Sequence, residues 1–531
     1  MIINSYIYGV ATSYDADAQL FFNAQTAAGV TLTTTQMDAV NQWVVDSKAA
    51  GIWTKFKAIY PFVGSTATSQ KFNLKNPLDT DAAFRLNFIG GGTHSSNGYQ
   101  PNGINSYANT FLTPSTNLTL SNFHLSFYSR TLTVGVVVEI GGNGNLASYT
   151  HLRIAANFVS GGGAATTLTF TTTTDARGFW LGTKRAANDR AVFRNNLKQN
   201  SSTVSDSNTL DTLPLFLGAQ NKAGVPALYS AKECAFATIG DGLTDLESQL
   251  FYQITEKYQV ALGRNINATQ SFYYNSAYNN ETNAFLFSTQ ITDNTIQTAT
   301  DTLVTDLKTA NIFTKMKAIY PMVGGTATTC KFNLKDPRDL NAAYRLTFFG
   351  GGTFSANGYQ GNGTNSYANT FLIPSTNLTH SNNHLSYYSR TDAVAANVCE
   401  VGSYNNASPF QFFGMQTKYT GNLFLCANGV NPYPSVSNTN SQGFHLMTKN
   451  GSSTQLNAFK NATKVITNGT TGIGISTTNV YIGAFNANGT AANYTTKECA
   501  FASIGDGLTD AEALALYNAV QTFNTTLARQ V

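Results

Sequence analysis

The segment from Lys57 to Thr131, which begins KAIYPFVGSTATSQKFNLKNP, returns almost unchanged from Lys317 to Thr391. Aligned without a gap, the two segments are identical at 56 of 75 positions. A long internal repeat sets the number of folding units in a chain. The 531 residues therefore predict two similar units of roughly 260 residues each, a size that single β-sandwich domains reach.

The composition is that of extracellular-type β structure. Charged residues make up 11% of the chain and aromatic residues 12%, beside abundant Gly, Asn, Thr and Ser. The net charge is +4 without a long Lys/Arg run, so no nucleic-acid partner is expected. The first residues lack the features of a signal peptide, and no apolar run is long enough to span a bilayer. We therefore expect a soluble protein without membrane insertion.

Each unit is expected to open and close with a helix. Thr33 and Gln36 fit a capping box ahead of an apolar helical face, and Asp293 is the candidate cap in the second copy. The closing helices begin with capping boxes from Thr244 to Glu247 and from Thr509 to Glu512. The sequence thus predicts units at residues 1–264 and 285–531, joined by an Asn/Ser/Tyr-rich connector at 265–284.

Between these helices run about a dozen short apolar segments separated by turn residues. This spacing predicts an all-β fold with two tandem antiparallel β-sandwiches. Five cysteines lack any CxxC pattern, and Cys234 and Cys499 occupy matching positions in the two copies. We expect both to be buried free thiols.

Several short motifs resemble the concanavalin A-like (laminin G-like) jelly-roll superfamily. They are NGINSY from Asn102 with its copy from Asn362, GFWLGT from Gly178, VFRNN from Val192, FLGA from Phe216, and the Gly-Leu-Thr-Asp-x-Glu start of each closing helix. The block KAIYP…KFNLKdP…GGT…NSYANTFL more narrowly resembles lectin-like domains of bacteriophage virion structural proteins. This resemblance implies tandem jelly rolls on a virion, with other virion proteins and host-surface glycans as partners, and a homo-oligomer such as a trimer.

Glycosidases of the superfamily resemble one another in a Glu-x-Asp-x-x-Glu strand, which this sequence lacks. Glu139 and Glu400 are the only acids retained in a strand setting that we would examine for catalysis, and neither has a second carboxylate at strand spacing. His124 and His384 match between the copies, but we expect them to pack. We therefore predict no catalytic residues, no metal site, no cofactor and no enzymatic activity.

Sugar recognition uses an aromatic face and polar groups that bind hydroxyls. The copied loops Asn97-Gly98-Tyr99-Gln100 and Asn357-Gly358-Tyr359-Gln360 offer both. Asn97, Tyr99, Asn357 and Tyr359 are therefore the predicted carbohydrate contacts, with a tyrosine tucked against the sandwich as the alternative. Other aromatic residues fall in segments where the copies differ and could set specificity, namely Tyr149, Tyr404 and Tyr433.

Three hypotheses follow. The first is a non-enzymatic virion structural protein, such as a head fibre, spike, decoration protein or tail adhesin, that displays two lectin-like domains for attachment to host glycans. The second is a soluble or cell-surface carbohydrate-binding protein. The third is a glycoside hydrolase or lyase, which the missing carboxylate pair disfavours.

Overall fold

The fold is taken from a computed structural model. It describes residues 14–145, 148–154, 157–160, 167–169, 174–205, 209–266, 272–393, 398–405, 411–420, 422–429, 433–451, 455–469, 472 and 474–531. The chain divides into two compact units, Met1–Ser276 and Ala277–Val531. We describe each unit by itself.

Among the described residues, each unit has three long helices. The first unit contains α1 (Ala16–Ala27), α2 (Thr34–Ala49) and α5 (Asp245–Ala261), and the second contains α6 (Asn280–Thr289), α7 (Asn294–Thr309) and α10 (Asp510–Thr526). The predicted capping boxes at Thr33, Thr244 and Thr509 are present, and Asp293 caps α7. The sequence analysis missed α1 and α6, and α6 starts inside the segment predicted as a connector.

Two sheets make up the body of the first unit. The eight-stranded sheet has the order β13 (Leu197–Ser202), β12 (Asp189–Arg194), β11 (Gly178–Ala186), β6 (Phe123–Ser129), β17 (Cys234–Gly240), β4 (Gly98–Gln100) and β3 (Thr93–Ser95), with β1 (Phe56–Tyr60) also on β17. The nine-stranded sheet has the order β10 (Thr167–Thr169), β9 (Asn157–Ser160), β8 (Ser148–Arg153), β7 (Ile140–Asn145), β14 (Phe216–Leu217), β5 (Tyr107–Asn109) and β2 (Asn87–Ile89), with β15 (Gln220–Lys222) on β7 and β16 (Val225–Ala227) on β15.

The second unit repeats this plan. Its eight-stranded sheet has the order β20 (Thr353–Ser355), β21 (Gly358–Gln360), β34 (Glu498–Gly505), β23 (Asn382–Ser389), β28 (Gly443–Asn450), β29 (Leu456–Lys460) and β30 (Thr463–Asn468), with β18 (Met316–Tyr320) on β34. Its nine-stranded sheet has the order β19 (Thr347–Phe349), β22 (Tyr367–Asn369), β31 (Tyr481–Ile482), β24 (Val401–Asn405), β25 (Gln411–Tyr419), β26 (Leu423–Asn428) and β27 (Ser435–Ser437), with β32 (Phe485–Ala487) on β24 and β33 (Thr490–Ala492) on β32.

Neighbours along these four orders pair antiparallel, whereas β15 and β32 pair in parallel with β7 and β24. The core of each unit lies between its two sheets and draws residues from both. The all-β, antiparallel and sandwich-like architecture is thus confirmed. The finer jelly-roll topology stays a prediction.

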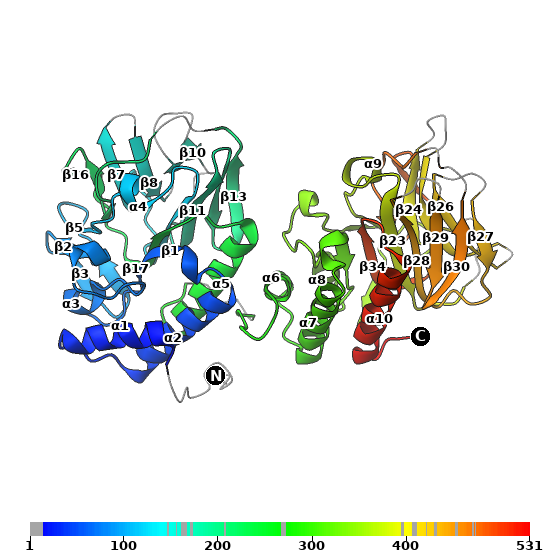
Figure 1. Ribbon diagram of the computed structural model, residues 1–531, viewed down its shortest axis with the longest axis horizontal. Coiled ribbons are helices and arrows are strands. Elements are labelled where there is room, and N and C mark those ends of the chain that lie inside the picture. The colour runs from blue at the N-terminus through cyan, green and yellow to red at the C-terminus, as the bar shows by residue number, and fades with distance from the viewer. Residues whose placement is uncertain are drawn as a thin grey trace. The chain divides into compact units, whose positions relative to one another are not determined.

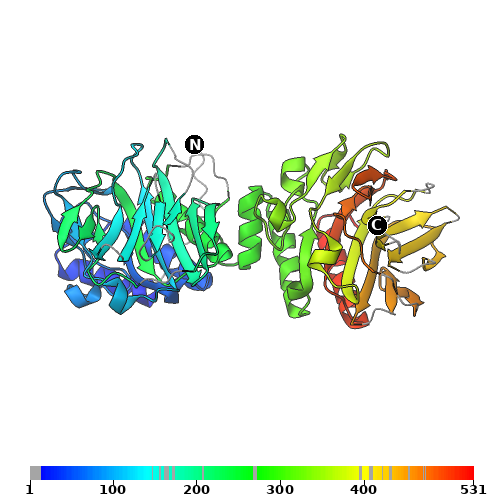
Figure 2. The same ribbon diagram turned by 90° about the horizontal axis from the view of Figure 1, so that it is seen from above.

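The helices α2 and α5 in the first unit, and α7 and α10 in the second, cover the outer face of the eight-stranded sheet. In the first unit the indole of Trp43 on α2 packs 5.1 Å from the ring of Phe236 on β17 and 6.3 Å from that of Phe251 on α5. In both views of the second unit, α7 (green) and α10 (red) lie on one side of the strands (Figure 1; Figure 2). Each unit is therefore a three-layer assembly of helices, one sheet and a second sheet.

A buried arginine ends each closing helix segment. The Arg529 guanidinium donates hydrogen bonds to the carbonyls of Pro321, Met322 and Ala500 at 2.6, 2.8 and 2.9 Å. Arg264 does the same in the first unit, to Pro61, Phe62 and Ala235. The Leu-Gly-Arg and Leu-Ala-Arg ends thus supply donors to buried carbonyls, of which that of Pro61 also accepts from the Tyr258 hydroxyl at 2.8 Å.

Four shorter helices and the cysteines complete the description. The short helices are α3 (Ala67–Gln70), α4 (Pro114–Asn117), α8 (Ala327–Cys330) and α9 (Pro374–Asn377). Cys234 and Cys499 are buried free thiols, as predicted.

Candidate functional site

The structure places Tyr99 and Tyr359 in the core. Tyr99 on β4 is 0% exposed and stacks between the rings of Phe62 and His94, and Tyr359 on β21 is 1% exposed. The alternative reading, a tyrosine tucked against the sandwich, describes both. A sugar could not reach either ring in this conformation, so neither tyrosine is a candidate sugar contact.

Asn97 and Asn357 lie in the two-residue turns between β3 and β4 and between β20 and β21. Their backbone N–H groups donate to the hydroxyls of Ser95 and Ser355 at 3.1 and 3.0 Å. Both side chains are half-buried, and they no longer have an accessible tyrosine beside them. Of the two predicted kinds of group, an aromatic ring and a polar side chain, these loops therefore offer only the polar side chain.

Glu139 and Glu400 are held in buried ion pairs. The Lys232 and Lys497 ammonium groups lie 2.8 and 2.7 Å from their carboxylates, and both glutamates are 0% exposed. The other carboxylate oxygen accepts a backbone hydrogen bond, from Thr417 at 2.6 Å in the case of Glu400. Burial raises the pKa of Glu139, although its lysine acts in the opposite sense. From their strand setting alone we expected hydrogen-bonded acids at an edge of the sandwich, but both glutamates lie inside their units.

His124 and His384 pack, as expected. The Nδ1 atom of His384 lies 2.6 Å from the carbonyl oxygen of Asp506, and its Nε2 atom lies 3.2 Å from the Ser503 hydroxyl. Burial lowers the pKa of each histidine to about 4. Both are therefore neutral at ordinary pH, with Nδ1–H donating to the carbonyl.

A pocket of about 380 Å³ opens on the outer face of the nine-stranded sheet in the second unit. Since side chains alternate across a strand, Val401, Phe413 and Met415 enter the core while Tyr404, Phe412 and Gln416 point outward. The pocket is lined by Cys399, Tyr404, Phe412, Gly414, Met415, Gln416, Tyr419, Leu425, Tyr433, Phe485 and Asn493. Its volume lies near the lower end of the roughly 300–1,000 Å³ typical of small-molecule sites.

Three aromatic rings pack together in this pocket, with the Phe412 ring stacked on both others and the Tyr404 and Phe485 rings tilted to each other. The ring centroids of Tyr404 and Phe412 are 4.9 Å apart, those of Tyr404 and Phe485 are 5.0 Å apart, and those of Phe412 and Phe485 are 5.5 Å apart. Tyr433 stands edge-on to Phe412 with centroids 4.7 Å apart. The rings come from β24, β25, β32 and the segment before β27, so neighbouring strands hold them in place.

Two facing glycines make room for this cluster. Gly402 and Gly414 pair across β24 and β25, and a Cβ atom at either position would lie 2.6 or 2.7 Å from Cε2 of Phe485. Such distances are too short for a real Cβ atom, so the Phe485 ring can take this position only over glycine.

Polar groups complete the lining. The Gln416 side-chain amide donates to the carbonyl of Val398 at 2.7 Å, and the Asn493 carbonyl accepts from the backbone N–H of Cys399 at 2.8 Å. Burial raises the pKa of Tyr433 to about 12 and raises that of the Cys399 thiol well above its usual value. The lining is therefore mixed, with aromatic surface beside a few fixed hydrogen-bonding groups, and it contains no Asp, Glu, Lys or Arg side chain.

The matching surface of the first unit is built differently. By strand register, Gly414 corresponds to His151 and Phe485 corresponds to Gln220. The Gln220 amide nitrogen lies 3.2 Å from His151 Nδ1, and both side chains are buried. A polar pair thus occupies the place where the second unit has a glycine and an aromatic ring.

The sequence analysis predicted only some of the residues that line this pocket. Tyr404 and Tyr433 were noted as tyrosines in divergent segments, and both line it, whereas the side chain of Tyr149 lies outside the described residues. Phe412 and Phe485 were missed. The signal for them is the exchange of Gly414 for a histidine and of Phe485 for a glutamine between otherwise similar copies.

Two further searches bear on the site. Among the described residues, no group of three or more His, Cys, Asp or Glu side chains could hold a metal ion. Within the same described ranges, no helix has the length and apolar character needed to cross a membrane.

A scan against protein-family models and a search of curated proteins gave no match. Solved structures with similarity include domain 4 of AbnA, a GH43 extracellular arabinanase from Geobacillus stearothermophilus, in complex with arabinotriose. That match has a TM-score of 0.25 and 14% identity, over 37% of this chain and 98% of that one. A mutant Trypanosoma rangeli sialidase that displays trans-sialidase activity matches with a TM-score of 0.29 and 12% identity, over 45% of this chain and 38% of that one.

A third match is the CBM40 of Ruminococcus gnavus IT-sialidase bound to α2,3-sialyllactose, with a TM-score of 0.20 and 12% identity, over 24% of this chain and 79% of that one. The prediction that the chain is not an enzyme is contradicted, because the proteins of similar structure include an arabinanase and sialidases. We withdraw it. The low scores and identities transfer no residue role to this chain.

Proposed function

We propose that this protein binds carbohydrate through the aromatic pocket of its second unit. The observation that carries the proposal is the cluster of the Tyr404, Phe412 and Phe485 rings, in which Phe485 lies over two facing glycines. A pyranose or furanose ring has an apolar face of C–H groups, which an aromatic surface desolvates favourably. The proposal takes the place of the predicted sites at Tyr99 and Tyr359.

The polar groups of the pocket suit the rest of a sugar. Gln416, Asn493 and the phenol groups of Tyr404 and Tyr433 can donate to and accept from hydroxyls. A few fixed polar groups in an apolar lining are the usual composition of a small-molecule site. With about 380 Å³, the pocket has room for a short glycan end.

The setting in which such binding would operate remains part of the proposal. We retain display on a bacteriophage virion, in a jelly-roll protein that attaches to host glycans, on the resemblance of the KAIYP…NSYANTFL block alone. Mass spectrometry of purified virions tests this setting, since absence of the chain from the particle would remove it. The pocket would then belong to a soluble or cell-surface lectin.

The binding proposal is tested by a glycan array followed by calorimetry on the full chain. We expect saturable binding to at least one oligosaccharide, which Phe485→Ala abolishes and Gln220→Ala leaves intact. Gln220 is the matched control because it holds the same register position in the first unit. Equal loss in both variants, or no binding to any glycan, would refute the proposal.

A further inference from the structure

We infer that this pocket selects uncharged sugars and rejects acidic ones such as sialic and uronic acids. The inference rests on the proposed carbohydrate binding and narrows its ligand class. Its starting point is that the described lining contains no Asp, Glu, Lys or Arg side chain. A pocket that bound a sugar carboxylate would need a cation or several well-placed donors to replace its lost water.

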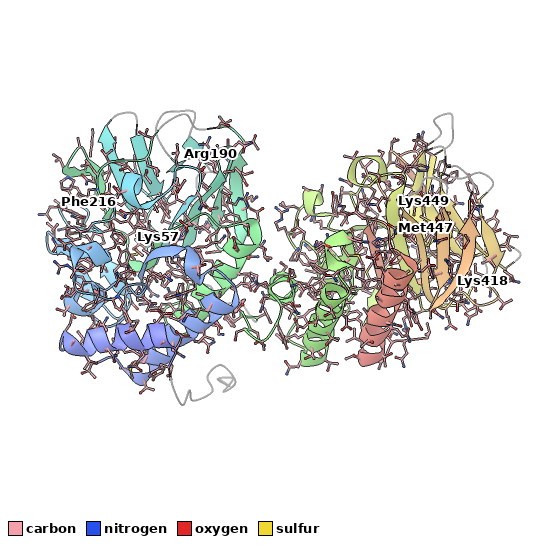
Figure 3. All side chains as sticks on the ribbon, in the orientation of Figure 1. Lys57, Arg190, Phe216, Lys418, Met447 and Lys449 are labelled. Atoms are coloured by element: carbon pink, nitrogen blue, oxygen red, sulfur yellow. The ribbon has the colours of Figure 1, made fainter. Side chains whose placement is uncertain are left out.

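The charged groups nearest in the chain are neutralised by partners of their own. Glu400, which follows the lining residue Cys399, is paired with Lys497 at 2.7 Å, and neither side chain is more than 1% exposed. Lys418, which is labelled in Figure 3, lies on β25 two residues after Gln416. Its buried ammonium group is 2.7 Å from the carboxylate of Asp392, whose side chain is partly exposed. Both lysines are therefore already paired with a carboxylate, and a ligand would have to compete with that partner.

The parts of the second unit outside the described residues bring no charge either. Their sequences are VAAN at 394–397, NASPF at 406–410, Gly at 421, VNP at 430–432, SST at 452–454, and Thr, Thr and Ile at 470, 471 and 473. None of these residues is acidic or basic. However these segments lie, they cannot supply a cation for a sugar carboxylate.

Two ionisable groups of the lining, the Tyr433 phenol and the Cys399 thiol, stay neutral over a wide pH range. Burial raises the pKa of Tyr433 to about 12 and that of Cys399 well above its usual value. A carboxylate placed against the three aromatic rings would therefore lose hydration without gaining a charged partner. A neutral sugar gives up only hydroxyl hydration, which the polar lining can replace.

The test compares matched neutral and acidic probes on the full chain. Calorimetry would use lactose with 3′-sialyllactose, and galactobiose with digalacturonic acid, together with the best neutral ligand from the array and its uronic acid form. We expect each bound neutral sugar to bind at least about tenfold more tightly than its acidic partner, a difference of about 1.4 kcal/mol. The affinity of the neutral sugar for the protein should also stay the same between roughly 0.05 and 0.5 M salt.

Adding a cation to the pocket lining provides a second test of charge selection. Gln416→Arg puts a cation on the pocket lining, so it should raise affinity for the acidic probes, whereas Gln416→Met should not. Acidic sugars that bind the wild-type chain as tightly as neutral ones, and lose binding in Phe485→Ala, would overturn this inference and leave the carbohydrate site standing. Failure of every probe and every array glycan would overturn both.

Discussion

The ring of Phe485 lies over Gly414, so close that a Cβ atom added to the glycine would meet Phe485 Cε2 at 2.7 Å. In the first unit the corresponding residues are Gln220 and His151, joined by a 3.2 Å polar contact. Two exchanges at contacting positions thus distinguish an aromatic surface from a polar one on the same sheet. The copies share a framework and differ where a ligand would bind.

This contact predicts that Gly414→Ala weakens carbohydrate binding. The methyl group would push the Phe485 ring away from Tyr404 and Phe412, so affinity should fall by at least about tenfold, or 1.4 kcal/mol. Calorimetry with the best array glycan measures the effect, and circular dichroism confirms the fold. His151→Ala, at the same register position in the first unit, is the control. Unchanged affinity in Gly414→Ala would show that the ring cluster does not hold the sugar.

Substitutions at Tyr359 are expected to lower the stability of the fold and to leave glycan affinity unchanged. Because its ring is 1% exposed and packs against Phe348 and Phe354, Tyr359→Ala should lower the free energy of unfolding by roughly 3–5 kcal/mol. The variant Tyr359→Phe, which keeps the ring, should cost less than about 1.5 kcal/mol. Denaturant unfolding measures both. Glycan affinity lost in Tyr359→Phe, with stability kept, would restore Tyr359 as a contact.

Arg529 is expected to be essential for the stability of the second unit. In Arg529→Met the carbonyls of Pro321, Met322 and Ala500 lose their donor inside the protein, at about 1–3 kcal/mol each. The unfolding free energy should fall by at least about 3 kcal/mol. The control is Arg345→Met, because Arg345 pairs with Asp339 at the surface and should contribute less than about 1 kcal/mol. Equal effects of the two variants in denaturant unfolding would contradict the role assigned to Arg529.

The buried histidines predict loss of stability in mild acid. Burial lowers the folded-state pKa of His124 and of His384 to about 4, below the usual histidine value of 6.5. Between these values the unfolded chain binds more protons than the folded chain, so the unfolding free energy falls as pH falls from 6.5 to 4. Each histidine accounts for up to roughly 3 kcal/mol. Denaturant unfolding at a series of pH values measures how steeply the unfolding free energy depends on pH. In His384→Gln one proton fewer is bound on unfolding, so this dependence should be weaker. A flat profile over this window would contradict the account.

Local sequence patterns were enough to predict much of the fold. A capping box spans only four residues, so Thr244 with Glu247 and Thr509 with Glu512 could be recognised before any tertiary contact was known. The helix α1 could have been found too, because Ala18, Phe21, Phe22 and Gln25 follow the i, i+3, i+4, i+7 pattern of a buried helical face.

The site depends on contacts that no local pattern encodes. Phe485 reaches Tyr404 through parallel pairing of β32 with β24, and Lys497 reaches Glu400 across 97 residues. Tyr99 was predicted to lie in an accessible loop because its neighbours in the sequence are turn residues. In the strand β4 the alternation of side chains turns Tyr99 into the core and leaves Gln100 exposed. Strand register, and not composition, decides which tyrosine can meet a sugar.

The most direct test of the central claim is calorimetric titration of the full chain with its best array glycan, before and after Phe412→Ala. Phe412 contacts the other three rings of the pocket and lies outside the core, so its removal should cost at least about 2 kcal/mol of binding free energy while the unfolding midpoint stays near that of the wild type. Binding that persists at wild-type affinity in Phe412→Ala would contradict the claim that this pocket is the carbohydrate site.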